Sequence, residues 1–415
     1  MLSKKKWAGV FAVACFFSLA CLVADNAQAV EKGIYFRGGA GFLFFNPPDR
    51  DSFPFHEFSA TSGAIDGRNQ SPLEFEPQDT TAAWNVALGY RFDPSVTPKC
   101  IGANPRVEFS SNFYFPEDSE TRSPLKPKGT GGGILGGAFY NQNGLKGVAL
   151  LGGDLPSTTS TTTTSVTVFD PTIEDFITIT TTTTQVIPGI DSVPDIRFTA
   201  DYDYVDFNLG IRTDYTLVKN RFFLSPYVGA IYAILDQRFT ISAETPSDLV
   251  AAPLWPYGKH EYRVTENLET HYFGATFGLD FIVRIIEGLT FSLGGAISPL
   301  YADTDMDIKS RGTMWTPTNP RVGTSTKVDD GDGTFTFRAM GKAELAYRIG
   351  WFKAAVLGMV DYWDYVPVVE YPEYSSGDWG VFTPGTYPSD VPGLDDGNMT
   401  NWILMFTATI LLPWP

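Results

Sequence analysis

The stretch WILMFTATILLPW, residues 402–414, decides the fold class of this chain. Its even positions form an unbroken apolar face: Trp402, Leu404, Phe406, Ala408, Ile410, Leu412 and Trp414. Side chains of a β-strand alternate between the two faces of the sheet, so this face can meet lipid while Thr407 and Thr409 point toward an interior. A strand of about 12 residues, tilted by about 40°, spans roughly 30 Å, which is the thickness of a bilayer's hydrocarbon core.

The same alternation recurs along the rest of the chain. From Ala82 to Phe92 the even positions are apolar or aromatic, whereas the odd positions are small, polar or charged. Counting every such segment gives about ten strands, near residues 33–45, 81–92, 105–116, 202–216, 221–235, 270–285, 289–301, 334–349, 352–366 and 400–412. The sequence therefore predicts an all-β protein, an antiparallel up-and-down transmembrane β-barrel. Aromatic residues expected in its membrane girdles are Trp84, Tyr90, Trp402 and Trp414.

The connections between these segments alternate in length. Long connections cover 46–80, 117–201, 236–269, 302–333 and 367–399, and shorter ones cover 93–104, 217–220, 286–288 and 350–351. Outer-membrane barrels have long exterior loops and short periplasmic turns in strict alternation. The order therefore predicts a bacterial outer-membrane protein with long exterior loops and with both termini in the periplasm.

The long connection at about 117–201 is expected to be an exterior insertion in a single barrel domain, residues 30–415. Its Thr-rich part predicts a hairpin with arms 161–169 and 176–186, joined through Asp170-Pro171; a disordered low-complexity segment is the alternative. Two apolar segments, 134–140 and 145–151, flank a turn-forming sequence. If they enter the wall, the barrel has twelve strands.

Residues 1–29 have the features of a cleaved signal peptide. Lysines at 4–6 precede an apolar run at 7–23, and Ala27-Gln28-Ala29 fits a signal-peptidase site. A lipoprotein signal ending at Cys21 is the alternative. After cleavage Cys100 is the one remaining cysteine, so no intramolecular disulfide is expected.

The net charge of -17 argues against a nucleic-acid partner, because phosphates attract basic surfaces. The expected partners are outer-membrane lipid or lipopolysaccharide and the barrel-assembly machinery, together with small solutes or ions if the lumen is open. The chain ends in Trp414-Pro415 rather than in an aromatic residue. Outer-membrane proteins usually end in an aromatic residue that resembles an assembly signal. We therefore expect Trp414 to act as that signal, displaced from the last position.

The predicted strands point many charged side chains away from lipid. The expected lumen-lining residues are Arg37, Arg91, Arg106, Glu108, Asp206, Arg212, Asp214, Asp280, Arg284, Arg338, Lys342, Glu344, Arg348, Lys353 and Asp361. Either these charges pair into a salt-bridge network that fills the barrel, or they line a narrow aqueous path and set its ion selectivity. A barrel of about ten strands is compatible with both.

A catalytic site is not expected, and neither is a cofactor or a metal. Omptin proteases have about ten strands and use aspartates with an Asp-His pair, but none of His56, His260 and His271 stands in Asp-x-His spacing. The acidic stretches 329–333 and 395–398 do not fit an EF-hand and are explained by ordinary turns.

Two functions remain open. The first is a porin-like passive channel or structural surface protein, and the second is an adhesin or receptor that acts through its long loops, such as the aromatic-rich 362–387. The segments 203–210, 226–230 and 273–280, together with 84–90, resemble the Legionella-type major outer-membrane protein family. That resemblance implies a porin-like major surface protein and no catalytic residues.

Overall fold

The computed structural model describes residues 32–48, 50, 52–59, 65–66, 80–92, 103–114, 119–124, 133–155, 158–170, 175–187, 190–192, 194–218, 221–250, 258–315, 322–372 and 389–413. The predictions for the signal peptide, Cys100 and Trp414 lie outside these residues. Within the described part of the chain, no helix is long and apolar enough to cross a membrane. The one described helix is α2 (Ser247–Val250).

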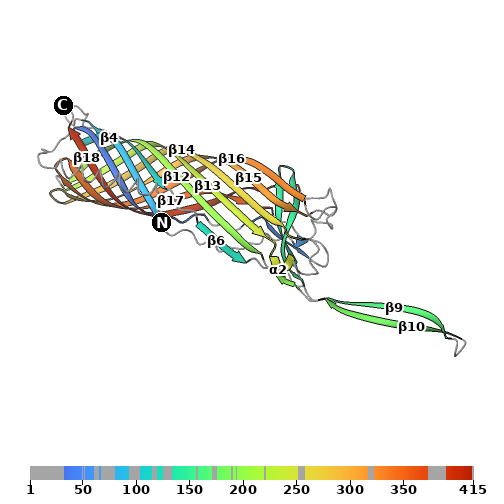
Figure 1. The fold of residues 1–415 in the computed structure, drawn as a ribbon. Coiled ribbons are helices and arrows are strands. Elements are labelled where there is room, and N and C mark those ends of the chain that lie inside the picture. Colours follow the sequence, from blue (N-terminus) through green and yellow to red (C-terminus); the bar gives the residue numbers. More distant parts are fainter. Residues whose placement is uncertain are drawn as a thin grey trace.

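Ten antiparallel strands close into a barrel (Figure 1). The main sheet has eleven strands, and all except β6 (Ser119–Pro124) belong to the ring. The ring strands are β1 (Gly33–Phe44), β4 (Thr81–Arg91), β5 (Ala103–Tyr114), β12 (Asp195–Val218), β13 (Phe222–Glu244), β14 (Glu261–Ile286), β15 (Leu289–Met314), β16 (Val322–Ile349), β17 (Phe352–Glu370) and β18 (Gly393–Pro413). The ring closes between β1 and β18, where Gly33 lies opposite Pro413. The predicted antiparallel barrel of about ten strands is confirmed.

The two ends of the barrel differ in their connections. At one end the strands are joined by short turns, for example at 287–288 and 350–351, and we call this the turn end. The opposite end carries the longer connections, and we call it the loop end. Gly33, the first residue of β1, and Pro413, the last residue of β18, both lie at the turn end.

Several strands are longer than the sequence pattern predicted. β14 begins at Glu261 rather than near residue 270, and β15 continues to Met314 rather than ending near residue 301. The predicted long loops 236–269 and 302–333 were therefore wrong in extent, because the wall strands occupy most of them. Figure 1 shows these strands running toward the loop end as part of one continuous sheet.

The cause of this difference is an exchange of polarity between the two faces of each long strand. On β14 the outward side chains are apolar from Phe273 to Ile285, and inward Asp280 is buried. From Glu261 to His271 the outward side chains are polar or charged, while inward Tyr262 is buried. A pattern search for apolar outward residues therefore stops at Phe273, although the strand continues.

Neighbouring strands exchange polarity in register with β14. The last outward aromatic residue before the polar part is Tyr232 on β13, Phe273 on β14, Tyr301 on β15 and Phe335 on β16, and these four lie opposite one another. About 13 residues of apolar strand at a tilt near 40° give a belt of roughly 30 Å, which matches the hydrocarbon core. Beyond the belt the wall has an apolar core on its inside, like a water-soluble barrel.

A second sheet lies at the loop end, against the inner face of the barrel wall, and we call it the plug. It has five strands in the order β11 (Ile190–Ser192), β8 (Gly144–Leu155), β7 (Gly133–Asn141), β2 (Phe55–Ser59) and β3 (Ile65–Asp66). The predicted apolar segments 134–140 and 145–151 form the β7–β8 hairpin, and they pair with each other rather than with ring strands. The twelve-strand alternative was therefore wrong, since the ring closes without them.

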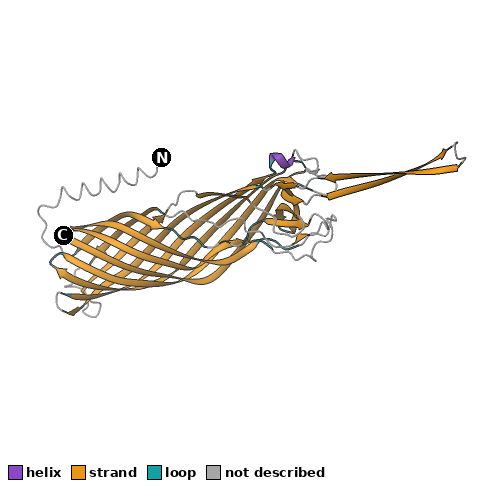
Figure 2. Ribbon diagram, turned by 90° about the horizontal axis from the view of Figure 1, so that it is seen from below, coloured by secondary structure: helices purple, strands orange, loops and turns teal. Residues whose placement is uncertain are grey.

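The Thr-rich region forms the predicted hairpin. β9 (Thr158–Asp170) pairs with β10 (Asp175–Ile187) from Thr158 opposite Ile187 to Asp170 opposite Asp175. Figures 1 and 2 both show this ribbon projecting away from the loop end of the barrel. The ribbon is a separate two-stranded sheet.

Candidate functional site

The centre of the lumen holds one arginine between two carboxylates. Nε and Nη2 of Arg338 donate to the two carboxylate oxygens of Asp361 at 2.7 and 2.8 Å, and Nη1 donates to Oδ2 of Asp206 at 3.0 Å. All three side chains are buried. The guanidinium also lies 4.7 Å from the ring centroid of Trp363, whose indole N–H donates to Asp361. A buried charge needs such partners, so the cluster is internally satisfied.

The cluster joins opposite sides of the wall. Arg338 is on β16 and Asp206 is on β12, which lies across the ring. Asp206 also accepts hydrogen bonds from Tyr204 at 2.9 Å and from the side-chain amide of Asn112 at 2.8 Å. The wall therefore has a polar cross-link at its centre, and we call the set Asp206, Arg338 and Asp361 the crossbar.

Between the crossbar and the turn end the predicted lumen charges form further ion pairs. Nη2 of Arg37 lies 2.9 Å from Glu108, which also accepts a hydrogen bond from Tyr35. The other pairs are Arg106–Asp214 at 3.2 Å, Arg212–Asp280 at 2.9 Å, Lys342–Asp280 at 3.0 Å and Lys353–Glu344 at 2.6 Å. The structure thus brings twelve of the predicted residues, counting the crossbar, into pairs inside the barrel.

The remaining three predicted residues are basic and lie at the turn end. Arg348 donates from Nε to the carbonyl oxygen of Gly350 in the β16–β17 turn at 2.8 Å. Arg284 is exposed, with its guanidinium 5.5 Å from the ring centroid of Phe223. Arg91 lies opposite Arg106 in the β4–β5 register. These three residues therefore lie at the turn-end mouth of the barrel, where Nε of Arg91 and Nη2 of Arg348 are buried without a hydrogen-bond partner among the residues that the structure describes.

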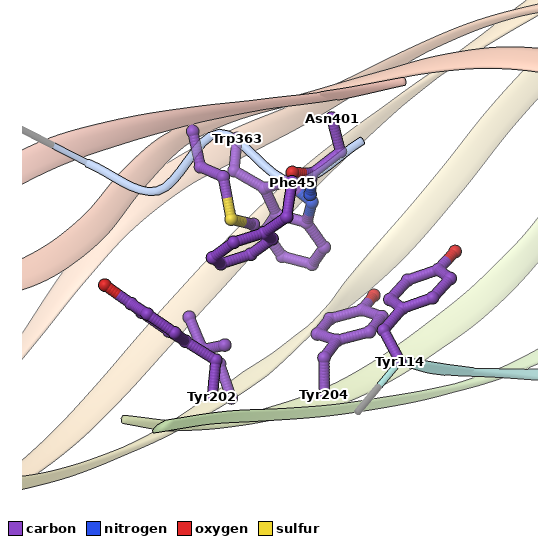
Figure 3. A pocket seen from close by; sticks show the side chains of 8 residues that line it. Phe45, Tyr114, Tyr202, Tyr204, Trp363 and Asn401 are labelled. Carbon is purple, nitrogen blue, oxygen red and sulfur yellow. The ribbon is translucent and has the colours of Figure 1, made fainter. Parts of the chain in front are cut away.

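Directly on the loop side of the crossbar, aromatic side chains fill the lumen (Figure 3). A cavity of ≈ 10 Å³ remains, lined by Phe45, Tyr114, Tyr202, Tyr204, Leu235, Trp363, Met399 and Asn401. Tyr114 stacks on Tyr204 at 5.0 Å, and Tyr204 meets the edge of Trp363 at 5.5 Å. A space of this size holds about one water molecule, so this layer leaves no room for a solute.

A second buried ion pair lies nearer the loop end. Nη2 of Arg50 donates to Oε1 of Glu266 at 2.7 Å, and the hydroxyl of Tyr371 donates to the same oxygen at 2.6 Å. Burial raises the pKa of Tyr371 well above its ordinary value, so the phenol remains a donor. The guanidinium also lies 5.0, 5.9 and 5.2 Å from the ring centroids of Phe53, Phe198 and Phe239.

Sequence reasoning missed this second pair, which we call the latch: Arg50, Glu266 and Tyr371. Arg50 and Tyr371 lie in connections rather than in ring strands, and Glu266 lies on the inward face of β14 beyond the point where polarity is exchanged. The one sequence feature that pointed to the latch was Glu266 itself, an inward glutamate between apolar inward neighbours. The latch fixes two loop-end segments to the wall.

The plug sheet packs onto the inner face of the wall by aromatic contacts. The ring of Tyr262 on β14 lies 5.8 Å from Phe55 and 5.1 Å from Phe139, and its hydroxyl donates to the carbonyl oxygen of Ala138 at 2.6 Å. His56 is fully buried, with Nε2 at 2.8 Å from the Tyr140 hydroxyl, and burial lowers the pKa of the imidazole to about 3. The loop end is therefore closed by a packed apolar core.

The predicted girdle residues that the structure describes lie on ring strands. Trp84 and Tyr90 are on β4, and Trp402 on β18 is more than half exposed on the outer face. Trp402 lies opposite Phe44 of β1 and Val360 of β17.

The histidines lie apart from the central lumen. His56 is in the plug, Nδ1 of His260 donates to the carbonyl oxygen of Thr313, and His271 lies on the outer wall beside Tyr232 and Glu269. Among the described residues, no group of three or more His, Cys, Asp or Glu side chains is arranged to hold a metal ion.

Comparisons with known proteins yield only distant structural likenesses. No family model matches the chain, and no curated protein matches it. The outer membrane protease OmpT from Escherichia coli is 10% identical, covers 94% of this chain and 100% of its own, and gives a TM-score of 0.36. The CymD monoaromatic hydrocarbon channel is 6% identical, with coverages of 92% and 90% and a TM-score of 0.26. A Pseudomonas aeruginosa FadL homologue is 9% identical, with coverages of 91% and 90% and a TM-score of 0.19. The barrel assignment therefore rests on the strand pairing of this chain itself.

Proposed function

We propose that this chain is an outer-membrane β-barrel whose lumen is closed, and that it acts as a structural surface protein rather than as a passive channel. The turn end, where β1 begins at Gly33 and β18 ends at Pro413, faces the periplasm, and the loop end stands outside the cell. The apolar belt of roughly bilayer thickness supports the membrane location. The proposal assigns no catalytic activity to the chain.

The filled lumen is the observation that carries the proposal. A solute moving along the axis would have to pass the crossbar, the aromatic layer and the plug sheet in succession. The crossbar atoms lie within hydrogen-bonding distance of one another, and the aromatic layer surrounds a cavity of ≈ 10 Å³.

Reconstitution in planar bilayers tests closure. We expect a silent membrane for the wild-type protein because each of the three layers blocks the axis. A matched variant combines Arg338→Ala, Trp363→Ala and Tyr204→Ala with deletion of the β7–β8 hairpin, residues 133–155, so that all three layers are opened. We expect the variant, checked for folding by its heat-modifiable gel mobility, to give measurable current, which also demonstrates insertion. Stepwise, salt-dependent current from the wild-type protein would overturn the proposal.

A second proposed function, adhesion or reception at the cell surface, is favoured by the projecting β9–β10 ribbon. The ribbon extends beyond the barrel, where a partner could reach it (Figure 2). Cells that display the full chain and cells that display a chain lacking residues 158–187 would be compared for attachment to a host-cell layer. Reduced attachment by the deletion supports adhesion through the ribbon, and equal attachment counts against it.

A further inference from the structure

An outward groove lies on the wall where its surface changes from apolar to polar. It has a volume of ≈ 410 Å³ and crosses four neighbouring strands, β14 to β17. Its outward side chains are Phe273, Pro299, Tyr301, Phe335, Phe337 and Asp364. The groove opens away from the filled lumen, so it is independent of the closed interior.

Pro299 explains why the wall is hollow at this place. It points outward in the middle of β15 and lies opposite Phe337, but its five-membered ring is much shorter than the aromatic side chains around it. Proline also lacks the N–H that would pair with β14. The β14–β15 ladder correspondingly lacks the pairs between Gly274–Leu300 and Phe277–Ile297, although the register is the same on either side. The bottom of the groove is therefore formed by the Pro299 ring and the backbone, and its sides are formed by the larger aromatic side chains.

The groove walls are aromatic rings at close spacing. Tyr301 lies 5.4 Å from Phe273 and 5.2 Å from Phe335 between ring centroids. Phe335 is 86% exposed, which is unusually high for a phenylalanine and leaves its ring faces available. Aromatic faces attract cations, and quaternary ammonium groups suit them best because their methyl groups bring little hydration into an apolar site.

The charge at the groove is negative. Asp364 is the one charged residue among the lining residues, all of which the structure describes, and the hydroxyl of Tyr362 lies 3.4 Å from its carboxylate. The next outward side chain on β15 beyond Tyr301 is the exposed Asp303. A purely anionic headgroup would be repelled here, whereas a cationic group would be attracted.

We propose that this groove binds the trimethylammonium end of a membrane-lipid headgroup, with Phe273, Tyr301 and Phe335 against the methyl groups and Asp364 opposite the charge. The position fits a headgroup, because the groove lies at the edge of the apolar belt with acyl chains on one side and water on the other. The inference depends on the barrel spanning a membrane and is independent of whether the lumen conducts.

Competition between two lipids with identical acyl chains tests the site. The full mature protein in a neutral maltoside detergent would be exposed to phosphatidylcholine and phosphatidylethanolamine together, and bound lipid would be counted by native mass spectrometry. We expect wild-type protein to prefer the choline lipid by about fivefold, because both headgroups carry the same charge but the ammonium of ethanolamine must give up more hydration to reach the aromatic rings. We expect Phe335→Leu combined with Asp364→Asn to abolish the preference.

Phe277→Leu is the matched control. Phe277 is also an outward phenylalanine of β14, but it lies outside the groove, so its replacement should leave the preference unchanged. Equal binding of the two lipids by wild-type protein would overturn the proposal. A preference that survives in the double variant, or that is lost equally in Phe277→Leu, would also overturn it, because the lipid would then be bound elsewhere on the belt. Failure of barrel insertion into vesicles would instead contradict the membrane location.

Discussion

Arg338 on β16 reaches across the lumen, and its Nη1 lies 3.0 Å from Oδ2 of Asp206 on β12. The two strands are four positions apart in one direction around the ring and six in the other. Asp361, on the neighbouring strand β17, accepts hydrogen bonds from Nε and Nη2 of the same guanidinium. One side chain therefore holds together parts of the wall that share no backbone hydrogen bonds.

Replacing the crossbar arginine should strongly destabilise the barrel. Arg338→Met leaves the buried carboxylates of Asp206 and Asp361 without a cation, which we expect to lower the free energy of unfolding by about 3–5 kcal/mol. Denaturant unfolding in lipid vesicles measures the change. Lys353→Met is the control, because Lys353 is 38% exposed beside Glu344 and its loss should cost about 1 kcal/mol or less. Equal, small effects of the two variants would show that the crossbar contributes little.

Breaking the latch should release the segment that carries Arg50. Arg50→Met leaves Glu266 buried without its cation, so we expect local opening of residues 45–56 to become easier by about 3 kcal/mol. Hydrogen exchange of these amides measures the opening. Arg238→Met is the control, since Arg238 is exposed and bonded only to Asn267 among the described hydrogen bonds. Unchanged exchange in Arg50→Met would contradict the latch.

A side chain at Gly137 should displace the plug from the wall. A Cβ at this position would lie 2.6 Å from the ring of Tyr262, which is held by its own hydrogen bond to Ala138. We expect Gly137→Val to destabilise plug docking by about 1–3 kcal/mol and to raise protease sensitivity within β7–β8. Gly358→Val has nothing within 4 Å of the new Cβ and should leave cleavage unchanged. Similar cleavage of the two variants would argue against the contact.

The docking of the plug should weaken in acid because of His56. Burial lowers the pKa of its imidazole from 6.5 to about 3, so the docked form keeps it neutral while a released segment takes up a proton below 6.5. The stabilisation is therefore complete above pH 6.5 and falls by about 1.4 kcal/mol per pH unit between 6.5 and 3.

Hydrogen exchange of β7, compared between wild type and His56→Gln, tests this pH dependence. Glutamine keeps a polar group near Tyr140 but does not titrate. We expect the ratio of wild-type to variant exchange to rise as the pH is lowered from about 7.5 to about 4.5. A ratio that stays constant across this range would show that the imidazole does not control docking.

The apolar-belt half of the fold could be predicted from the sequence, whereas at the loop end only the Thr-rich hairpin could be. The alternation of apolar and polar residues identified every ring strand, because lipid and lumen impose opposite requirements on successive side chains. Beyond residues such as Phe273 and Tyr301 the same strands keep alternating with the faces exchanged, so the strand ends were placed too early.

The candidate site divides in a similar way. Inward charges such as Arg338 and Asp361 follow from face assignment alone, but which charges pair depends on barrel diameter and register, which no single strand encodes. The latch was not predictable by this route. Arg50 and Tyr371 come from connections, and only the closed wall brings them to Glu266.

The plug has a consequence for the order in which the molecule is assembled. Its strands come from residues between β1 and β12, whereas the wall that covers it is made from β14 to β16, later in the chain. The plug segments therefore cannot bury their apolar side chains until the later wall strands are in place. Because β1 and β18 are the first and last ring strands, their pairing is available only after the whole chain has been delivered. The loop-end core is thus a late product of maturation, and a stalled intermediate would present Phe55, Phe139 and Tyr140 to any chaperone or protease nearby.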